Sequence, residues 1–262
     1  MKPTLPWLMA HDRPSPERIA SWKGPRYRES EFAYLPPVVR PPAFRDFDAT
    51  ATPGGTAVDS RAEPAFYFSN PTTLVGHRAS VHAPAGSTEL DFELELGVVI
   101  GHGGINIPRA RAWEHVFGFT ILNDFSARDV ERRERSAGCG PAKSKDFATA
   151  VGPWLVSRNV FHDRVDGETL TLEVCGRVNG HEISRGNLAQ LRHSIPSMIE
   201  RASRDAELLP GDLIGTGTVD VGSLRDHGPA RNGGWLKPGD VVELEVERIG
   251  ILKTSIVARP AP

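Results

Sequence analysis

Carboxylates stand at every second position in one short segment, and this spacing suggests a metal site. They are Asp91, Glu93 and Glu95, with leucine or phenylalanine at the positions between them. Such alternation predicts a strand that carries the three carboxylates on one face. Hard cations such as Mg²⁺ prefer oxygen ligands, so Glu93 and Glu95 could share one divalent ion. Without an ion, two buried carboxylates would repel each other and one would take up a proton.

The same spacing also has a purely structural explanation. Glu243 and Glu245 repeat the Glu-x-Glu pattern in another segment, where alternating apolar residues predict a strand with a solvated face. An isolated Glu-x-Glu pair therefore does not show whether a segment binds a metal ion. The surrounding sequence has to distinguish a metal site from a charged strand surface.

The composition excludes several classes of protein. Among 262 residues, 39% are hydrophobic and 24% are charged, as in ordinary globular domains. With Lys+Arg 31 against Asp+Glu 33, the chain lacks the basic surface of a general nucleic-acid binder. No apolar run reaches the ~20 residues that span a bilayer, so no membrane partner is expected. Two cysteines are too few for a disulfide framework, and we expect reduced thiols in a cytoplasmic protein.

The elements that must position the carboxylates are mostly strands. We expect strands over residues 90–100, 119–122 and 242–247, a hairpin turn at Asn179-Gly180, a helix starting near Pro108 and a helix within residues 195–207. The strands are not spaced as repeated βαβ units, so the predicted fold class is mostly β with a few helices (α+β). Residues 1–64 are rich in proline and glycine and are interpreted as an N-terminal arm or lid region, with a catalytic domain over residues 65–262.

Two segments, residues 90–101 (LDFELELGVVIG) and residues 123–129 (NDFSARD), resemble the fumarylacetoacetate hydrolase family, especially its fumarylacetoacetase-like bacterial members. Residues 90–101, LDFELELGVVIG, resemble the metal-binding strand of that family. About thirty residues later, residues 123–129 read NDFSARD and resemble the family signature N-D-[WF]-S-A-R-D. Further matches occur at residues 67–71, 211–218 and 235–242. The resemblance implies a mixed β-roll fold and a homodimer.

The resemblance also implies a set of metal ligands. Glu93, Glu95 and Asp124 match family ligand positions, and Asp46 matches the place where fumarylacetoacetases supply a further aspartate. The implied ion is Mg²⁺ or Mn²⁺, with Ca²⁺ as a further candidate. Asp91 shares the strand face but matches no ligand position.

Substrate contacts follow from the same resemblance. Arg128 would face the substrate carboxylate or, alternatively, form a structural salt bridge to a ligand carboxylate. Lys145 matches the family lysine that binds substrate oxygens, although Lys143 is a rival assignment. Thr218 would hydrogen-bond the substrate carboxylate, and Glu131 stands where the family has a glutamine-like position.

The family pattern breaks at the general base. The position of the histidine that activates water in hydrolytic fumarylacetoacetases is Pro53, and proline cannot move a proton. The family's partner acid aligns with Asp226. The neighbouring His227 is the best substitute base, since an unperturbed histidine side chain has a pKa of ~6.5. A solvent-exposed loop histidine is the competing explanation.

These features predict a divalent-metal-dependent enzyme acting on a small keto acid. The leading hypothesis is cleavage of a C–C bond next to a carbonyl in an acylpyruvate-like or 1,3-dicarbonyl acid, as in a hydrolase. The alternative keeps the site but performs decarboxylation or keto–enol tautomerisation, which needs no attacking water. A third hypothesis is a non-catalytic binding homologue. A metal that polarises the substrate carbonyl serves each of the enzymatic outcomes.

Overall fold

Strands form most of the regular structure in this computed structural model, which describes residues 27–48, 63–219 and 221–260, together with residues 17, 21, 23 and 24. The larger of two main sheets has seven strands in the order β2-β1-β14-β6-β7-β9-β3. Its strands are β1 (Phe44–Phe47), β2 (Phe66–Phe68), β3 (Leu74–Val75), β6 (Leu94–Ile100), β7 (Val116–Asp124), β9 (Thr149–Ser157) and β14 (Leu213–Gly215). The sheet is mixed, because β1 pairs parallel with β14 and antiparallel with β2.

The second main sheet has five strands in the order β13-β12-β15-β16-β4. Its strands are β4 (Ser80–Val81), β12 (Glu173–Val178), β13 (His181–Asn187), β15 (Val241–Val246) and β16 (Gly250–Ile256). The predicted hairpin turn joins β12 to β13, and both Asn179 and Gly180 have positive φ angles there. Two small sheets pair β5 (Leu90–Asp91) with β8 (Ser126–Ala127), and β10 (Val165–Asp166) with β11 (Thr169–Leu170).

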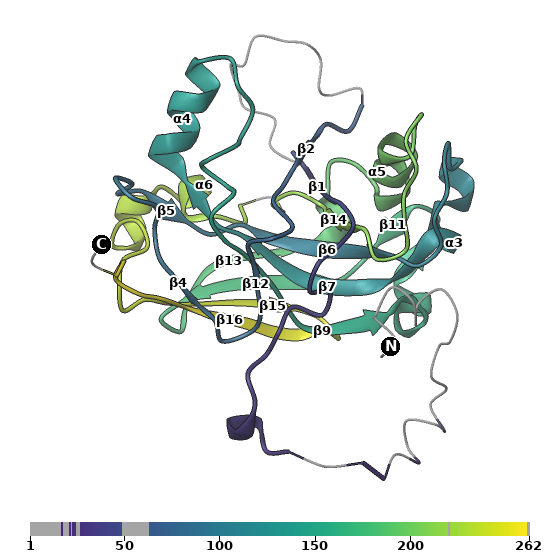
Figure 1. The fold of residues 1–262 in the computed structure, drawn as a ribbon, viewed down its shortest axis with the longest axis horizontal. Helices are drawn as coiled ribbons and strands as arrows, with labels where there is room; N and C mark the ends of the chain where they lie inside the picture. Colours follow the sequence, from purple (N-terminus) through teal and green to yellow (C-terminus); the bar gives the residue numbers. More distant parts are fainter. Residues whose placement is uncertain are drawn as a thin grey trace.

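The two main sheets pack against each other and share one hydrophobic core. Figure 1 shows the five-stranded sheet lying along one side of the seven-stranded sheet, in a curled arrangement. In β15, Val242, Leu244 and Val246 point into this core, and the glutamates between them are partly exposed, as the alternation predicted. The predicted class, mostly β with a few helices, is confirmed.

The helices are short and lie outside the sheets (Figure 1). They are α3 (Ala112–His115), α4 (Arg128–Ser136), α5 (Ile195–Ala202) and α6 (Leu224–His227), with 3-10 turns at Glu29–Glu31, Arg109–Arg111, Arg158–Arg164, Leu188–Gln190 and Pro229–Asn232. The helix predicted within residues 195–207 is α5, whose N-terminus is capped by the Ser194 side chain. None of the described helices is both long and apolar enough to cross a bilayer.

The helix expected to start near Pro108 ends at His115, although Trp113, Val116 and Phe117 stand at helical spacing in the sequence. Val116 and Phe117 belong to β7, where Val116 pairs with Ile100 of β6. Here sheet pairing prevailed over the helical spacing, because a β-branched residue and an aromatic residue fit a pleated surface well. β7 therefore begins three residues before the strand start predicted at residue 119 and ends at Asp124, two residues beyond the predicted end at residue 122.

The strand predicted over residues 90–100 is interrupted at Phe92 and Glu93. Its first part, β5, pairs with β8, whereas β6 runs through the large sheet. Asp91 Oδ1 accepts a hydrogen bond of 2.8 Å from the Phe92 backbone N–H, which diverts that donor from a strand ladder. The interruption lets Asp91 and Glu93 reach groups outside the sheet.

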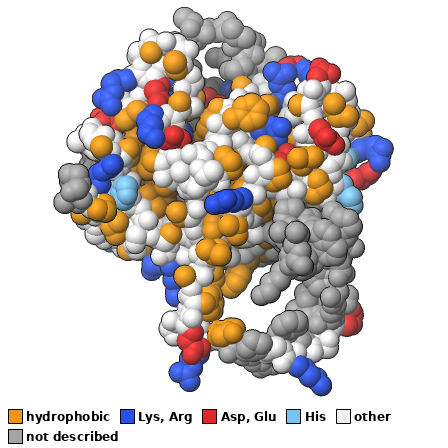
Figure 2. All heavy atoms as spheres, viewed as in Figure 1, with side chains coloured by type: hydrophobic (Ala, Val, Ile, Leu, Met, Phe, Trp, Pro, Cys, Tyr) orange, Lys and Arg blue, Asp and Glu red, His pale blue; other side chains and the backbone are white. Residues whose placement is uncertain are grey.

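The boundary predicted after residue 64 separates two strands that pair with each other. Asp46 of β1 lies opposite Tyr67 of β2, so the large sheet takes strands from both predicted regions. The described residues before β1 include Tyr27, Phe32, Leu35 and Val39, which are exposed. Figure 2 shows hydrophobic side chains along this segment, below the main body of the molecule.

Candidate functional site

Three buried carboxylates from three strands converge in the large sheet. They belong to Asp46 of β1, Glu95 of β6 and Asp124 at the end of β7. Each offers one oxygen, and the three oxygens lie within 4.8 Å of one another. Because divalent ions hold oxygen ligands at roughly 2.0–2.6 Å, oxygens at this separation can share a single ion.

The electrostatics of this triad favour a cation. Burial, together with the charge of Asp124, raises the pKa of Asp46 to about 8. Burial and the charge of Asp46 likewise raise the pKa of Glu95 well above its ordinary value. Among the described residues, Asp46 Oδ1 is buried without a hydrogen-bond partner. A hard divalent cation would neutralise the triad and satisfy this oxygen, so the donor set fits Mg²⁺ or Mn²⁺.

A glycine keeps the space between these carboxylates open. Gly215 of β14 lies opposite Asp46 in the parallel register. A Cβ atom at this position would lie 2.2 Å from Asp46 Oδ1 and 2.9 Å from Glu95 Oε2. No side chain can therefore replace the hydrogen of Gly215 without displacing the carboxylates.

Tyr67 and Thr149 hold the triad in place, although the sequence did not mark either as a site residue. The Tyr67 hydroxyl lies 2.6 Å from Asp124 Oδ2 and 3.2 Å from Asp46 Oδ2. Thr149 donates a hydrogen bond of 3.1 Å to Asp124 Oδ1. The resemblance at residues 67–71 was a signal that could have drawn attention to Tyr67.

Lys145 places a positive charge beside the triad. Its ammonium lies 2.8 Å from Asp124 Oδ2 and also forms an ion pair with Glu93 Oε2. Burial alone would lower the pKa of Lys145, but the charges of Asp124 and Glu93 raise it above its usual value. The rival Lys143 is exposed and pairs with Asp146 instead. This placement favours Lys145 as the lysine of the site.

Glu93 lies next to the triad but turns toward cations. Its Oε1 lies 2.8 Å from Arg128 Nη2, and its Oε2 binds Lys145. Burial would raise the pKa of Glu93, but Lys145 and Arg128 hold it well below its ordinary value. Of the four predicted ligands, the structure therefore brings Asp46, Glu95 and Asp124 together. Glu93 is connected to this group by its ion pair with Lys145.

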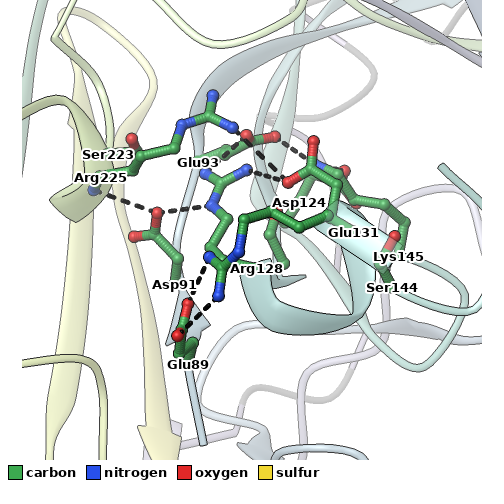
Figure 3. Close-up of polar contacts among 12 residues, drawn as sticks. Glu89, Asp91, Glu93, Asp124, Arg128, Glu131, Ser144, Lys145, Ser223 and Arg225 are labelled. Atoms are coloured by element: carbon green, nitrogen blue, oxygen red, sulfur yellow. Dashed lines mark hydrogen bonds and ion pairs between the residues drawn. The ribbon is translucent and has the colours of Figure 1, made fainter. Parts of the chain in front are cut away.

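Arg128 is buried among three carboxylates, which agrees with the alternative that it forms a structural salt bridge. Its Nε donates to Asp91 at 2.8 Å and its Nη1 to Glu131 at 2.9 Å, in addition to the ion pair with Glu93. Asp91 also accepts hydrogen bonds from the backbone N–H groups of Leu224 and Arg225 in α6. Figure 3 shows Asp91 and Glu93 on either side of the Arg128 guanidinium. Asp91, set aside by sequence comparison, thus fixes both Arg128 and α6.

A small pocket opens onto this cluster. It is lined by residues that include Tyr67, Glu93, Glu95, Glu131, Lys145 and Thr218. Thr218 is buried beside Gly217, whose backbone N–H donates to Glu95 Oε2 at 3.1 Å. Glu131 reaches the pocket with both carboxylate oxygens bound to arginines.

Asp226 and His227 are not brought into the site. Asp226 Oδ2 accepts from the Ser223 backbone N–H and hydroxyl, which forms a capping box at the start of α6. His227 Nε2 contacts the backbone oxygen of Val221 at 2.8 Å. The pattern Ser-x-x-Asp could have predicted this capping role. The acid and base roles expected for these two residues thus find no support in their contacts, and Pro53 lies outside the described residues.

The arrangement combines a divalent-ion site with fixed cations in a partly closed pocket. Such a site can bind the oxygens of a keto acid and stabilise negative charge that develops on them. Within the described residues, the pocket lining offers lysine, glutamate, aspartate and tyrosine as groups that exchange protons, but no histidine. The geometry therefore suits the formation or protonation of an enolate.

Comparison with known protein sequences finds a matching family and several similar proteins. The family described as "Fumarylacetoacetate (FAA) hydrolase C-terminal" matches residues 43–257. Oxaloacetate tautomerase YisK of Bacillus subtilis is 35% identical over 203 residues, which cover 77% of this chain and 64% of that protein. The mitochondrial oxaloacetate tautomerase FAHD2A of Homo sapiens is 33% identical over 237 residues, covering 87% of this chain and 70% of that protein. The chain thus spans less than two thirds of the Bacillus subtilis relative.

Solved structures share the fold. A 2-hydroxyhepta-2,4-diene-1,7-dioate isomerase from Mycobacterium marinum superposes with a TM-score of 0.71 at 28% identity, covering 92% of this chain and 84% of that chain. A fumarylpyruvate hydrolase from Pseudomonas aeruginosa, solved in complex with Mn²⁺ and pyruvate, gives a TM-score of 0.69 at 26% identity, covering 83% and 90%. Proteins of this fold are thus named as both isomerases and hydrolases.

Proposed function

The chain belongs to the fumarylacetoacetate hydrolase family, and from this premise we propose that it is a divalent-metal-dependent tautomerase that interconverts the keto and enol forms of a 2-oxo acid. The observation that carries the proposal is the buried triad of Asp46, Glu95 and Asp124 with the Lys145 ammonium at its edge. Enolisation requires a metal ion that polarises the carbonyl and a group that transfers a proton, and the triad and Lys145 would supply these two functions.

Each residue of the site would have its own role in the reaction. Asp46, Glu95 and Asp124 would hold Mg²⁺ or Mn²⁺, which supplies Lewis-acid polarisation of the substrate carbonyl. Lys145 Nζ would donate a hydrogen bond to the substrate oxygen. It would then give a proton to the adjacent carbon and receive the enol proton, so that no water is consumed. Thr218, which lines the same pocket, would orient the substrate carboxylate.

Tautomerisation explains the contacts of this site better than hydrolysis does. For hydrolysis, His227, Asp226 or the metal itself would have to activate water, and Asp226 and His227 make other contacts. Two relatives are named oxaloacetate tautomerases, which supports a small 2-oxo acid as the substrate. The alternative hypothesis from the sequence therefore becomes the leading one.

The proposal is tested by following the enol form of oxaloacetate by ultraviolet absorbance. We expect the protein with Mg²⁺ or Mn²⁺ to accelerate the loss of the enol signal, and we expect a chelator to abolish that acceleration. Loss of the enol signal at the buffer rate, with metal bound, would refute the proposal. Chelator-sensitive turnover would also exclude a non-catalytic binding protein.

Cleavage of a C–C bond in an acylpyruvate remains a second candidate because a fumarylpyruvate hydrolase shares the fold. Incubation with an acylpyruvate in H₂¹⁸O separates the two reactions. Incorporation of ¹⁸O into a released acid would support hydrolysis. Enol turnover without ¹⁸O-labelled acid would leave tautomerisation as the activity.

A further inference from the structure

The loop that carries Lys145 is attached to α4 by the carboxylate of Glu134. This carboxylate, in the last turn of α4, accepts hydrogen bonds from three consecutive backbone N–H groups and one hydroxyl. The backbone donors are Ala142 at 3.0 Å, Lys143 at 2.6 Å and Ser144 at 3.2 Å, and the Ser144 hydroxyl donates at 2.6 Å. Four donors thus converge on Glu134 immediately before Lys145 in the chain.

Glu134 holds the loop where the chain passes from the surface into the site. Residues 137–140, 142 and 143 are exposed, whereas Ser144 and Lys145 are buried. Burial would raise the pKa of Glu134, but hydrogen bonds from Ser144 and from the backbone N–H of Ala142 hold it below its ordinary value. Glu134 is therefore charged at neutral pH, and hydrogen bonds to a charged carboxylate are stronger than those to a neutral acceptor.

The same helix also contacts the site from a second direction. Arg128 begins α4, and Glu134 follows six residues later. Arg128 binds Glu93 Oε1 at 2.8 Å, and Lys145 forms an ion pair with Glu93 Oε2. Figure 3 shows Ser144 and Lys145 next to each other at one edge of this cluster. The contacts form a closed ring that leads from α4 to Glu93 and Lys145 and returns to α4 through Glu134.

We propose that Glu134 is a positioning residue that sets where the Lys145 ammonium lies beside the triad, and thereby the rate of proton transfer. This inference rests on the proposed function, because Lys145 is the proposed proton carrier. The ammonium stands at the end of a flexible side chain, so its location depends on how the backbone of Lys145 is held. Proton transfer needs close alignment, and a small displacement slows it strongly.

Replacing Glu134 by Gln tests this role, because the side chain keeps its size and loses its charge. We measure turnover of the enol form of oxaloacetate by Mg²⁺-loaded protein. We expect kcat to fall about tenfold while KM and Mg²⁺ affinity stay unchanged. The solvent deuterium isotope effect on kcat should rise, because proton transfer becomes slower relative to the other steps. Glu134→Asp should recover part of the loss, because the charge is kept.

A double-mutant cycle shows whether Glu134 acts through Lys145. In the Lys145→Met background, Glu134→Gln should cause no further loss of kcat, because both changes affect the same ammonium. An equal loss in both backgrounds would overturn the proposal. The control is Glu114→Gln, which removes an exposed carboxylate that binds Arg111 outside the site and should leave kcat unchanged.

Ser144→Ala is a milder variant that removes one donor and keeps the three backbone N–H groups. We expect it to lower kcat about threefold, with no change in KM. This variant provides the test if Glu134→Gln does not fold. Wild-type kcat in Ser144→Ala and in any folded Glu134→Gln protein would show that the contacts of Glu134 do not position Lys145.

Nuclear magnetic resonance of ¹⁵N-labelled lysine follows the Lys145 ammonium without any turnover. Because this ammonium is buried and ion-paired, we expect a resolved Nζ signal that disappears in Lys145→Met. Glu134→Gln should shift or broaden this signal, and Glu114→Gln should leave it unchanged. An unchanged signal in Glu134→Gln would overturn the proposal. If the wild-type protein does not accelerate loss of the enol, the proposed function fails, and the ¹⁵N signal alone decides the role of Glu134.

Discussion

Lys145 Nζ lies 2.8 Å from Asp124 Oδ2, an oxygen of the carboxylate that completes the triad with Asp46 and Glu95. The Lys145 ammonium and a divalent ion would therefore both be attracted by the negative charge of Asp124. A bound ion would weaken the attraction that now raises the pKa of Lys145, and so would make its proton easier to transfer. Metal binding and proton transfer are linked through Asp124.

Replacing Lys145 by Met should separate these two roles. We expect at least a hundredfold loss of tautomerase turnover, because the proton carrier is gone, while Mn²⁺ affinity stays equal or rises, because a competing cation is removed. Turnover and calorimetric Mn²⁺ titration measure the two effects. Lys143→Met, which alters the exposed rival lysine, should change neither. Loss of Mn²⁺ binding in Lys145→Met would contradict this division of roles.

Replacing Glu95 by Gln should abolish tight metal binding. We expect Mn²⁺ affinity to fall at least a hundredfold, because one charged ligand of three is lost. The metal-free variant should be no less stable than the metal-free wild type, because the repulsion among buried carboxylates decreases. Calorimetry and thermal unfolding test the two parts. Glu245→Gln, which alters the same sequence pattern on a partly exposed strand face, is the control.

Replacing Gly215 by Ala should damage the site through sterics alone. The added methyl group would meet Asp46 Oδ1, so we expect weaker Mn²⁺ binding and a loss of about 1–3 kcal/mol in the free energy of unfolding. Denaturant unfolding and Mn²⁺ titration measure these losses. Gly140→Ala provides the comparison, since no described atom lies within 4 Å of its added Cβ. Wild-type Mn²⁺ affinity in Gly215→Ala would show that the triad is not the metal site.

Metal affinity should rise with pH up to about 8. The pKa of Asp46 is raised from 3.8 to about 8, so the folded metal-free protein holds a proton that an ion must displace. We expect Mn²⁺ affinity to rise at least tenfold per pH unit below 8, because Asp46 releases its proton and Glu95, whose pKa is also raised, can release another. The metal-free protein should lose stability as pH rises from about 4 to about 8, because the unfolded chain gives up this proton earlier. A pH-independent affinity between 6 and 8 would refute the assignment.

Replacing Asp91 by Asn should disturb the positioning of Arg128 and α6 without removing a metal ligand. We expect the free energy of unfolding to fall by about 1.5–3 kcal/mol, because a buried charge-assisted hydrogen bond is lost. Mn²⁺ affinity should change little. A double-mutant cycle with Arg128→Met measures the coupling of the pair. Additive effects of the two substitutions would show that the ion pair contributes nothing.

The sequence predicted much of the site because its signals are local. The segments at residues 90–101 and 123–129 carry Glu95 and Asp124 on adjacent strands, and the pairing of Leu94 with Asn123 brings these segments together. The strand near residue 242 and the turn at Asn179 could also be predicted from the sequence, because alternation and positive-φ residues are local properties. Asp46 was found only through the resemblance, since a single charged residue in a short strand carries no periodic signal.

By itself, the sequence determined the mostly β class, the acidic strand segment and the family to which the chain belongs. Only the tertiary structure decided that Asp46, Glu95 and Asp124 face one another, that Glu93 turns to Lys145 and Arg128, and that Asp226 caps α6. The reason is physical: alternation fixes which face of a strand a side chain occupies, whereas its partners depend on the register between distant strands and on which buried charges neutralise each other.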